Sequence, residues 1–154
     1  MDDEGHKRMY CSAKSRSLIS IAILVIVVLQ TNLLKAHAHA IFEINNVSSS
    51  DGYVVLHLYE NKTSFKKFNP DRIYKKVATK GKTIIPINDY HEGDIAIFVF
   101  HDENSDEEFN TSIFWTPKEG YAYSNSYIPT SIPKYEEALF RLEHGVAVNL
   151  ELIY

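Results

Sequence analysis

The feature that most constrains the fold is an apolar alternation with a period of two residues, which recurs between residues 41 and 154. It is clearest in three stretches, at 54–59, 95–100 and 146–154. A period of two is typical of β-strands, because successive side chains point to opposite faces of a sheet. Residues 95–100 are apolar at every position, so we expect this strand to be central and buried on both faces.

Weaker alternation predicts five further strands, at 41–45, 72–77, 82–87, 121–127 and 138–143. Turn residues separate the predicted strands. Asp51-Gly52 precedes the strand at 54–59. His144-Gly145 separates the last two strands by two residues, which predicts a hairpin between them.

Seven or eight short strands within residues 41–154 indicate an all-β domain. The expected architecture is an antiparallel β-sandwich of immunoglobulin-like or transthyretin-like type. Pro86 is expected on an edge strand or at a bulge, and one helical turn is expected within residues 64–74. Cys11 is the only cysteine in the chain, so the domain is expected to fold without a disulfide or a cysteine-based metal site.

Residues 1–40 have the features of an export signal. Twelve apolar or small residues at 18–29 follow Lys14 and Arg16, and alanines alternate with histidines at 36–40. A basic segment, a short apolar run and a small-x-small exit together predict a secretory signal peptide. The segment preceding the sandwich is thus expected to be a hydrophobic signal helix.

Cleavage is expected after Ala38 or Ala40, which leaves residues 41–154 in the periplasm or outside the cell. The alternative is an uncleaved signal anchor that holds the domain outside the cytoplasm. A spanning helix needs about 20 apolar residues, and this run supplies twelve. Contact with a membrane is expected only through this segment, if it is retained.

The charge of the exported part argues against nucleic acid as a partner. The chain holds 16 basic and 20 acidic residues, of which five and three lie in residues 1–40. Residues 41–154 therefore carry 11 basic and 17 acidic side chains. Such an acidic surface repels phosphate backbones.

An acidic stretch after the strand at 95–100 is the one candidate metal site. Oxygen-bearing side chains recur at every second residue, at Asp102, Asn104, Asp106 and Glu108. Calcium loops collect hard oxygen ligands with this spacing. Glu107 stands where such a loop has glycine, and Ile113 stands where it has a bidentate glutamate. The alternative is an acidic turn in contact with solvent.

Motifs of catalysis are absent from the sequence. It contains no GxSxG, no phosphate-binding loop and no GxGxxG. The histidines of the domain lack the spacing of a zinc site, and His101 stands out only because it adjoins the acidic stretch. The chain is therefore expected not to be an enzyme and, calcium apart, to need no cofactor.

Four segments carry a family resemblance: FHDEN at 100–104, PKEGY at 117–121, SN at 124–125 and PKYEEALF at 133–140. In this order they resemble the pattern of the family known as domain of unknown function 2141, over essentially all of residues 41–154. The resemblance implies a secreted or periplasmic bacterial β-sandwich that follows a signal peptide. It supplies no activity.

The favoured hypothesis is a non-enzymatic binding or structural module of the cell envelope, with an unknown envelope or extracellular ligand. Trp115, Tyr121 and Tyr123 form a candidate ligand surface beside the acidic stretch. Alternatively, these aromatic residues cover the core beneath a long connection. One further hypothesis is a calcium-stabilised structural domain, and another is a transthyretin-like hydrolase, which rests on fold class alone.

Overall fold

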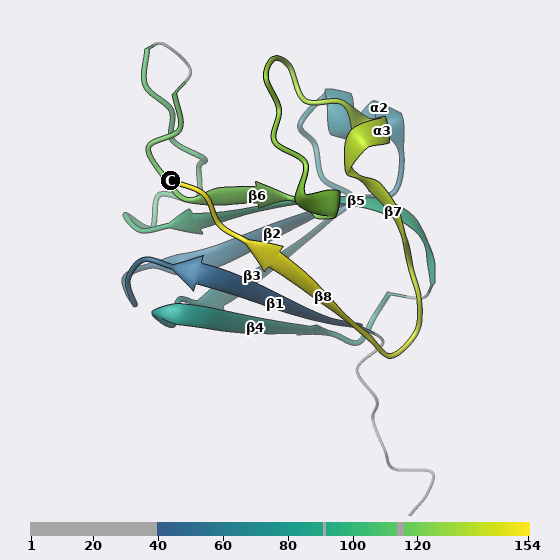
Figure 1. The fold of residues 1–154 in the computed structure, drawn as a ribbon, viewed down its shortest axis with the longest axis horizontal. Helices are drawn as coiled ribbons and strands as arrows, with labels where there is room; N and C mark the ends of the chain where they lie inside the picture. The colour runs from purple at the N-terminus through teal and green to yellow at the C-terminus, as the bar shows by residue number, and fades with distance from the viewer. Residues whose placement is uncertain (1–39, 91, 114–115) are drawn as a thin grey trace, which may run out of the picture. The chain divides into compact units, whose positions relative to one another are not determined.

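The computed structural model describes residues 40–90, 92–113 and 116–154 (Figure 1). The predicted signal peptide at residues 1–39, with the possible cleavage position Ala38, lies outside the described residues. The alternative position, Ala40, is the first residue of strand β1. Cleavage and the domain boundary at residue 40 both stay predictions. Within the described part of the chain, no helix has the length and the apolar character that crossing a bilayer requires.

Eight strands form two sheets in the part of the chain that the structure describes. The three-stranded sheet has the order β4-β1-β8, with β1 at Ala40–Val47, β4 at Gly81–Ile87 and β8 at Val146–Glu151. The five-stranded sheet consists of β2 at Tyr53–Tyr59, β3 at Arg72–Val77, β5 at Gly93–Asp102, β6 at Tyr121–Tyr123 and β7 at Leu139–Leu142. The prediction of a mostly β domain with seven or eight strands is confirmed.

Strand β5 organises the larger sheet. Strand β2 lies along one side of it, while β6 and β7 pair with different segments of its other side. The prediction of a central strand at 95–100 is therefore confirmed. Pro86 lies on β4, which is an edge strand of the smaller sheet, also as predicted.

Two predictions about strand pairing are corrected. Among the strands that the structure describes, all pairs are antiparallel except β1 and β8, which run parallel, with Phe42 opposite Val148. The predicted hairpin at His144-Gly145 is wrong, because β7 pairs with β5 and β8 pairs with β1 in the other sheet. The two-residue turn reverses the chain, but each strand pairs with a different open edge, so the chain changes sheet there.

The two sheets pack face to face around one apolar core. Strand β1 contributes Phe42 and Ile44, and their side chains are fully buried in one cluster with residues from β2 and β5. Leu150 and Leu152 extend this cluster from the C-terminal segment. Each fully buried side chain of this kind contributes about 1.5–3 kcal/mol, so the core is the main source of stability.

The opposite face of the five-stranded sheet is covered by short elements. These are α2 at Lys62–Lys66, η1 at Ser124–Ser126 and α3 at Tyr135–Ala138, and α2 and α3 lie together over the sheet (Figure 1). Helix α2 overlaps the predicted helical turn at 64–74. Asn61 caps it by accepting hydrogen bonds from the backbone N–H groups of Thr63 and Ser64, both at 3.0 Å. Strand β6 is shorter than the predicted strand at 121–127 because η1 follows it directly.

We predict that Gly52→Ala destabilises the domain far more than Gly81→Ala. Both glycines have positive φ, at +64° and +87°, so alanine at either position costs about 1–2 kcal/mol of backbone strain. At Gly52 the added Cβ would also lie 1.9 Å from the carbonyl oxygen of Asp102, whereas at Gly81 it would meet nothing within 4 Å. Urea unfolding should give a loss of about 3 kcal/mol or more for Gly52→Ala. Equal losses for the two variants would contradict the close approach of Gly52 to β5.

Candidate functional site

An aromatic pocket lies on the outer face of the five-stranded sheet. Its volume is about 1140 Å³, and its lining includes the rings of His57, Tyr59, Phe98, Phe109, Tyr121 and Tyr123. Small-molecule sites are commonly concave and apolar, with a few polar groups among aromatic side chains. This pocket has that composition.

Strand register explains why the rings come together. His57 on β2 lies opposite Phe98 on β5, and Phe98 lies opposite Tyr123 on β6. Residues opposite each other in neighbouring strands share a face, so the three rings form one row across the sheet. The ring centroids of Phe98 and Tyr123 are 4.8 Å apart. Phe109, from the loop after β5, packs edge-on against Phe98 at 5.0 Å.

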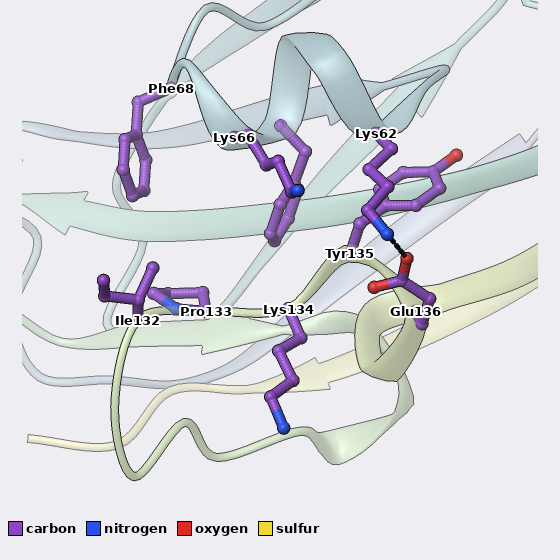
Figure 2. A pocket seen from close by; sticks show the side chains of 9 residues that line it. Lys62, Lys66, Phe68, Ile132, Pro133, Lys134, Tyr135 and Glu136 are labelled. Atoms are coloured by element: carbon purple, nitrogen blue, oxygen red, sulfur yellow. Dashed lines mark ion pairs between the residues drawn. The ribbon is translucent and has the colours of Figure 1, made fainter.

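A second, smaller pocket of about 460 Å³ adjoins the aromatic pocket. The two share Lys66, Phe68, Ile132 and Pro133 in their linings. Figure 2 shows Lys66 at the end of α2 and Phe68 in the turn that follows it. They face Ile132 and Pro133 from the loop before α3. An ion pair between Lys62 and Glu136 ties α2 to α3 beside this pocket. The shared residues thus form a rim between two short helices.

The floor of the aromatic pocket carries no charge at neutral pH. Burial lowers the pKa of His57 to about 4, so its imidazole is neutral there. Burial raises the pKa of Tyr59 and of Tyr123 well above the ordinary range, so both keep their hydroxyl protons. The charged side chains of the lining are Lys66 and Glu108, and both residues are exposed.

The structure places the predicted calcium residues in the loop between β5 and β6. Asp102 is fully buried at the end of β5, and its two carboxylate oxygens accept hydrogen bonds from the backbone N–H groups of Asp106 and Glu107, each at 3.1 Å. The side-chain amide of Asn104 donates to the Asp106 carboxylate at 2.7 Å. Glu108, in contrast, is exposed and lines the aromatic pocket.

Three carboxylates come close together at the base of this loop. One oxygen from each of Asp102, Asp106 and Glu119 lies within 4.8 Å of the other two. Glu119 is only 6% exposed, and its Oε2 accepts a hydrogen bond from the backbone N–H of Asn110 at 3.0 Å. Burial raises the pKa of Glu119, and the negative charges of Asp102 and Asp106 add to this rise. The group contains two predicted ligands and one residue that sequence reasoning missed.

Two of the three predicted aromatic residues line the pocket. Tyr123 is buried in its floor, while Tyr121 is half-buried beside Phe109, with ring centroids 5.5 Å apart. Trp115 lies outside the described residues, so its part in a ligand surface stays a prediction.

His101 serves to hold chain segments together. Its ring is fully buried, and Nε2 donates a hydrogen bond to the backbone carbonyl of Asp51 at 2.9 Å. The other ring nitrogen, Nδ1, lies 3.2 Å from the Tyr154 hydroxyl and 3.3 Å from Ser48 Oγ. A catalytic base needs a ring nitrogen open to substrate. His101 instead joins the β1–β2 loop to the C-terminal residue.

The aromatic pocket and the cluster of three carboxylates both fall within one family match. Residues 42–149 match the family model described as "Uncharacterized protein conserved in bacteria (DUF2141)". The chain belongs to this family. The resemblance inferred from the four sequence segments is thereby confirmed. Comparison with curated proteins and with solved structures gave no match.

Among the residues of the site that the sequence did not point to, His57 and Glu119 were missed for different reasons. His57 follows the period-two pattern of β2, but a lone histidine gives no sign that its face of the strand is covered by aromatic rings. Glu119 lies within the family segment 117–121, yet it is 17 positions away from Asp102. It reaches Asp102 because the loop folds back on itself through a bridge between Thr111 and Pro117.

We predict that His57 makes the domain less stable as the pH falls from about 6.5 to about 4. The folded state holds the pKa of His57 at about 4, against an ordinary value of 6.5, so only the unfolded chain takes up this proton in that range. Proton uptake by the unfolded state alone favours unfolding, by about 2 kcal/mol over the full range.

The measurement is urea unfolding of the wild type and of His57→Phe at several pH values. The variant keeps a ring in the pocket and removes the titration. Its free energy of unfolding should fall less steeply than that of the wild type between pH 6.5 and pH 4. Parallel curves for the two proteins would show that His57 titrates alike in the folded and unfolded states.

Proposed function

We propose that the chain is an exported, non-enzymatic module that binds an uncharged small molecule in its aromatic pocket. The observation that carries this proposal is the row of His57, Phe98 and Tyr123 across the sheet, which forms the pocket floor. Aromatic side chains supply a large apolar contact area, and their faces suit flat or ring-shaped ligands.

The protonation states of the floor support an uncharged ligand. A charged group placed against a neutral, partly buried surface loses hydration without gaining a partner of opposite charge. The neutral imidazole of His57 and the hydroxyl groups of Tyr59 and Tyr123 offer hydrogen bonds to neutral polar groups. A ligand with a ring face and a few hydroxyl or carbonyl groups fits this chemistry best.

Export is supported by the sequence of residues 1–40, with its basic segment, its apolar run at 18–29 and its alternating alanines. The immunoglobulin-like or transthyretin-like type of the sandwich is part of the same proposal, and the two sheets around a common core support it. Such sandwiches present loops at their ends on a rigid scaffold. Here the loop between β5 and β6 contributes Phe109, Thr111 and Pro117 to the pocket.

The test is binding of the uncharged fluorophore N-phenyl-1-naphthylamine to the full chain, followed by its fluorescence. Phe68 is 61% exposed on the pocket rim, so Phe68→Asp puts a charge there without disturbing the core. We predict that this variant weakens probe binding about tenfold or more, because the charge must lose hydration when the probe binds.

The matched control is Ile84→Asp. Ile84 is 48% exposed on β4, in the other sheet, and it does not line the pocket. The Ile84→Asp variant should bind the probe as the wild type does. The apolar run at 18–29 is common to all three proteins, so it cannot cause a difference between them. Equal loss of binding in both variants, or no loss in Phe68→Asp, would count against the pocket as the binding site.

A further inference from the structure

The carboxylates of Asp102, Asp106 and Glu119 come from three places along the chain. Asp102 ends β5, Asp106 lies in the loop, and Glu119 lies two residues before β6. One oxygen of each is within 4.8 Å of the other two. Three negative charges at this separation repel one another, so the fold pays for holding them together unless something positive lies between them.

The first two carboxylates are held in place by hydrogen bonds from neighbouring N–H groups. Both oxygens of Asp102 accept backbone hydrogen bonds, from Asp106 and Glu107. The Oδ1 atom of Asp106 accepts from the backbone N–H of Glu108 at 2.9 Å, and this bond, with the Asn104 amide, lowers the pKa of Asp106. A carboxylate oxygen has two lone pairs, so each can still bind a cation.

Glu119 supplies the independent sign of a ligand. The residue is 94% buried, since only 6% of it is exposed. Its Oε1 atom is buried and has no hydrogen-bond partner among the described residues. Buried polar atoms are nearly always paired, and an unpaired carboxylate oxygen is costly. Oε1 belongs to the same carboxylate that faces Asp102 and Asp106, where a cation would satisfy it.

We propose that Asp102, Asp106 and Glu119 bind one calcium ion. All three ligands are hard oxygen donors, and the group includes no histidine or cysteine, which favours calcium over zinc. Magnesium demands a near-ideal octahedron at short distances, whereas calcium accepts irregular oxygen sites. With three protein carboxylates, the expected Kd is about 10⁻⁴–10⁻³ M, as in extracellular calcium modules.

This ligand set differs from the one that the spacing of the acidic stretch predicts. Glu119 replaces Glu108, because the loop folds Glu119 back onto Asp102 while Glu108 lies at the aromatic pocket. The evidence for the calcium site is independent of the evidence for the small-molecule pocket. Failure of the fluorophore experiment would leave the calcium site standing, and the reverse also holds.

The test compares thermal unfolding of the full chain, followed by circular dichroism, in chelator, in 10 mM calcium chloride and in 10 mM magnesium chloride. Sodium chloride equalises the ionic strength. Calcium should raise Tm by about 5 °C through selective binding to the folded state. Isothermal titration calorimetry should give one calcium per chain. No calcium-dependent shift, or an equal shift with magnesium, would overturn the assignment.

Two glutamine variants in the same loop test the ligand set. Glu119→Gln should lose the calcium shift, and in chelator it should be at least as stable as the wild type, because it removes one repelling charge. Glu108→Gln should keep the full shift. If Glu108→Gln loses the shift and Glu119→Gln keeps it, the three-carboxylate site is wrong. Asp106→Asn provides the same test at an exposed position if Glu119→Gln fails to fold.

Discussion

The rest of the structure depends on one constraint, which is that β5 is apolar on both of its faces. Residues 95–100 are all buried, so the domain must cover this strand from two sides. The three-stranded sheet covers one side with a continuous layer of large apolar residues. The other side receives only short elements and loops, packed around Phe65, Phe98 and Phe100. The two coverings differ in completeness, and that difference creates the pocket.

Simple dimensions explain why the second covering is incomplete. Helix α2 has five residues and α3 has four, so each is only about 6–8 Å long. Four strands side by side span about 14 Å between the outermost axes. Two such helices cannot cover the face, and the loops after β5 and before α3 close part of the remaining area. Aromatic rings suit the remaining hollow, because they bury a large area and still present polar atoms toward water.

The fold was predictable from the sequence where local pattern decides it. The alternation at 54–59 and 95–100 identified strands, and the fully apolar run identified the central one. Pairing was harder, because the turn at His144-Gly145 says that the chain reverses but not which open edge each strand meets. The match of β8 with β1 joins residues about 100 positions apart, as Phe42 opposite Val148 shows. Nothing in the local sequence encodes such a contact.

The candidate site was predictable only in part, for a related reason. Asp102 and Asp106 stand out because they lie four positions apart in one acidic stretch, and Tyr121 and Tyr123 because aromatic residues alternate there. Glu119 joins the first pair only through the fold of the loop. His57 joins the aromatic row only through the register of three strands. Long-range geometry, which a pattern within one segment does not contain, supplies both residues.

The loop between β5 and β6 links the two proposed sites. The three carboxylates lie at the base of this loop. The part of the loop beyond them, here called its arm, contributes Phe109 and Pro117 to the pocket. A cation that removes repulsion at the base favours the folded arm, and a small molecule that packs against Phe109 favours the same arm. If both sites bind as proposed and share this arm, binding at one would strengthen binding at the other by an equal factor, because coupling between equilibria is reciprocal. Under these two proposals, the buried carboxylate of Glu119 would contribute to the energetics of the pocket, although it does not line it.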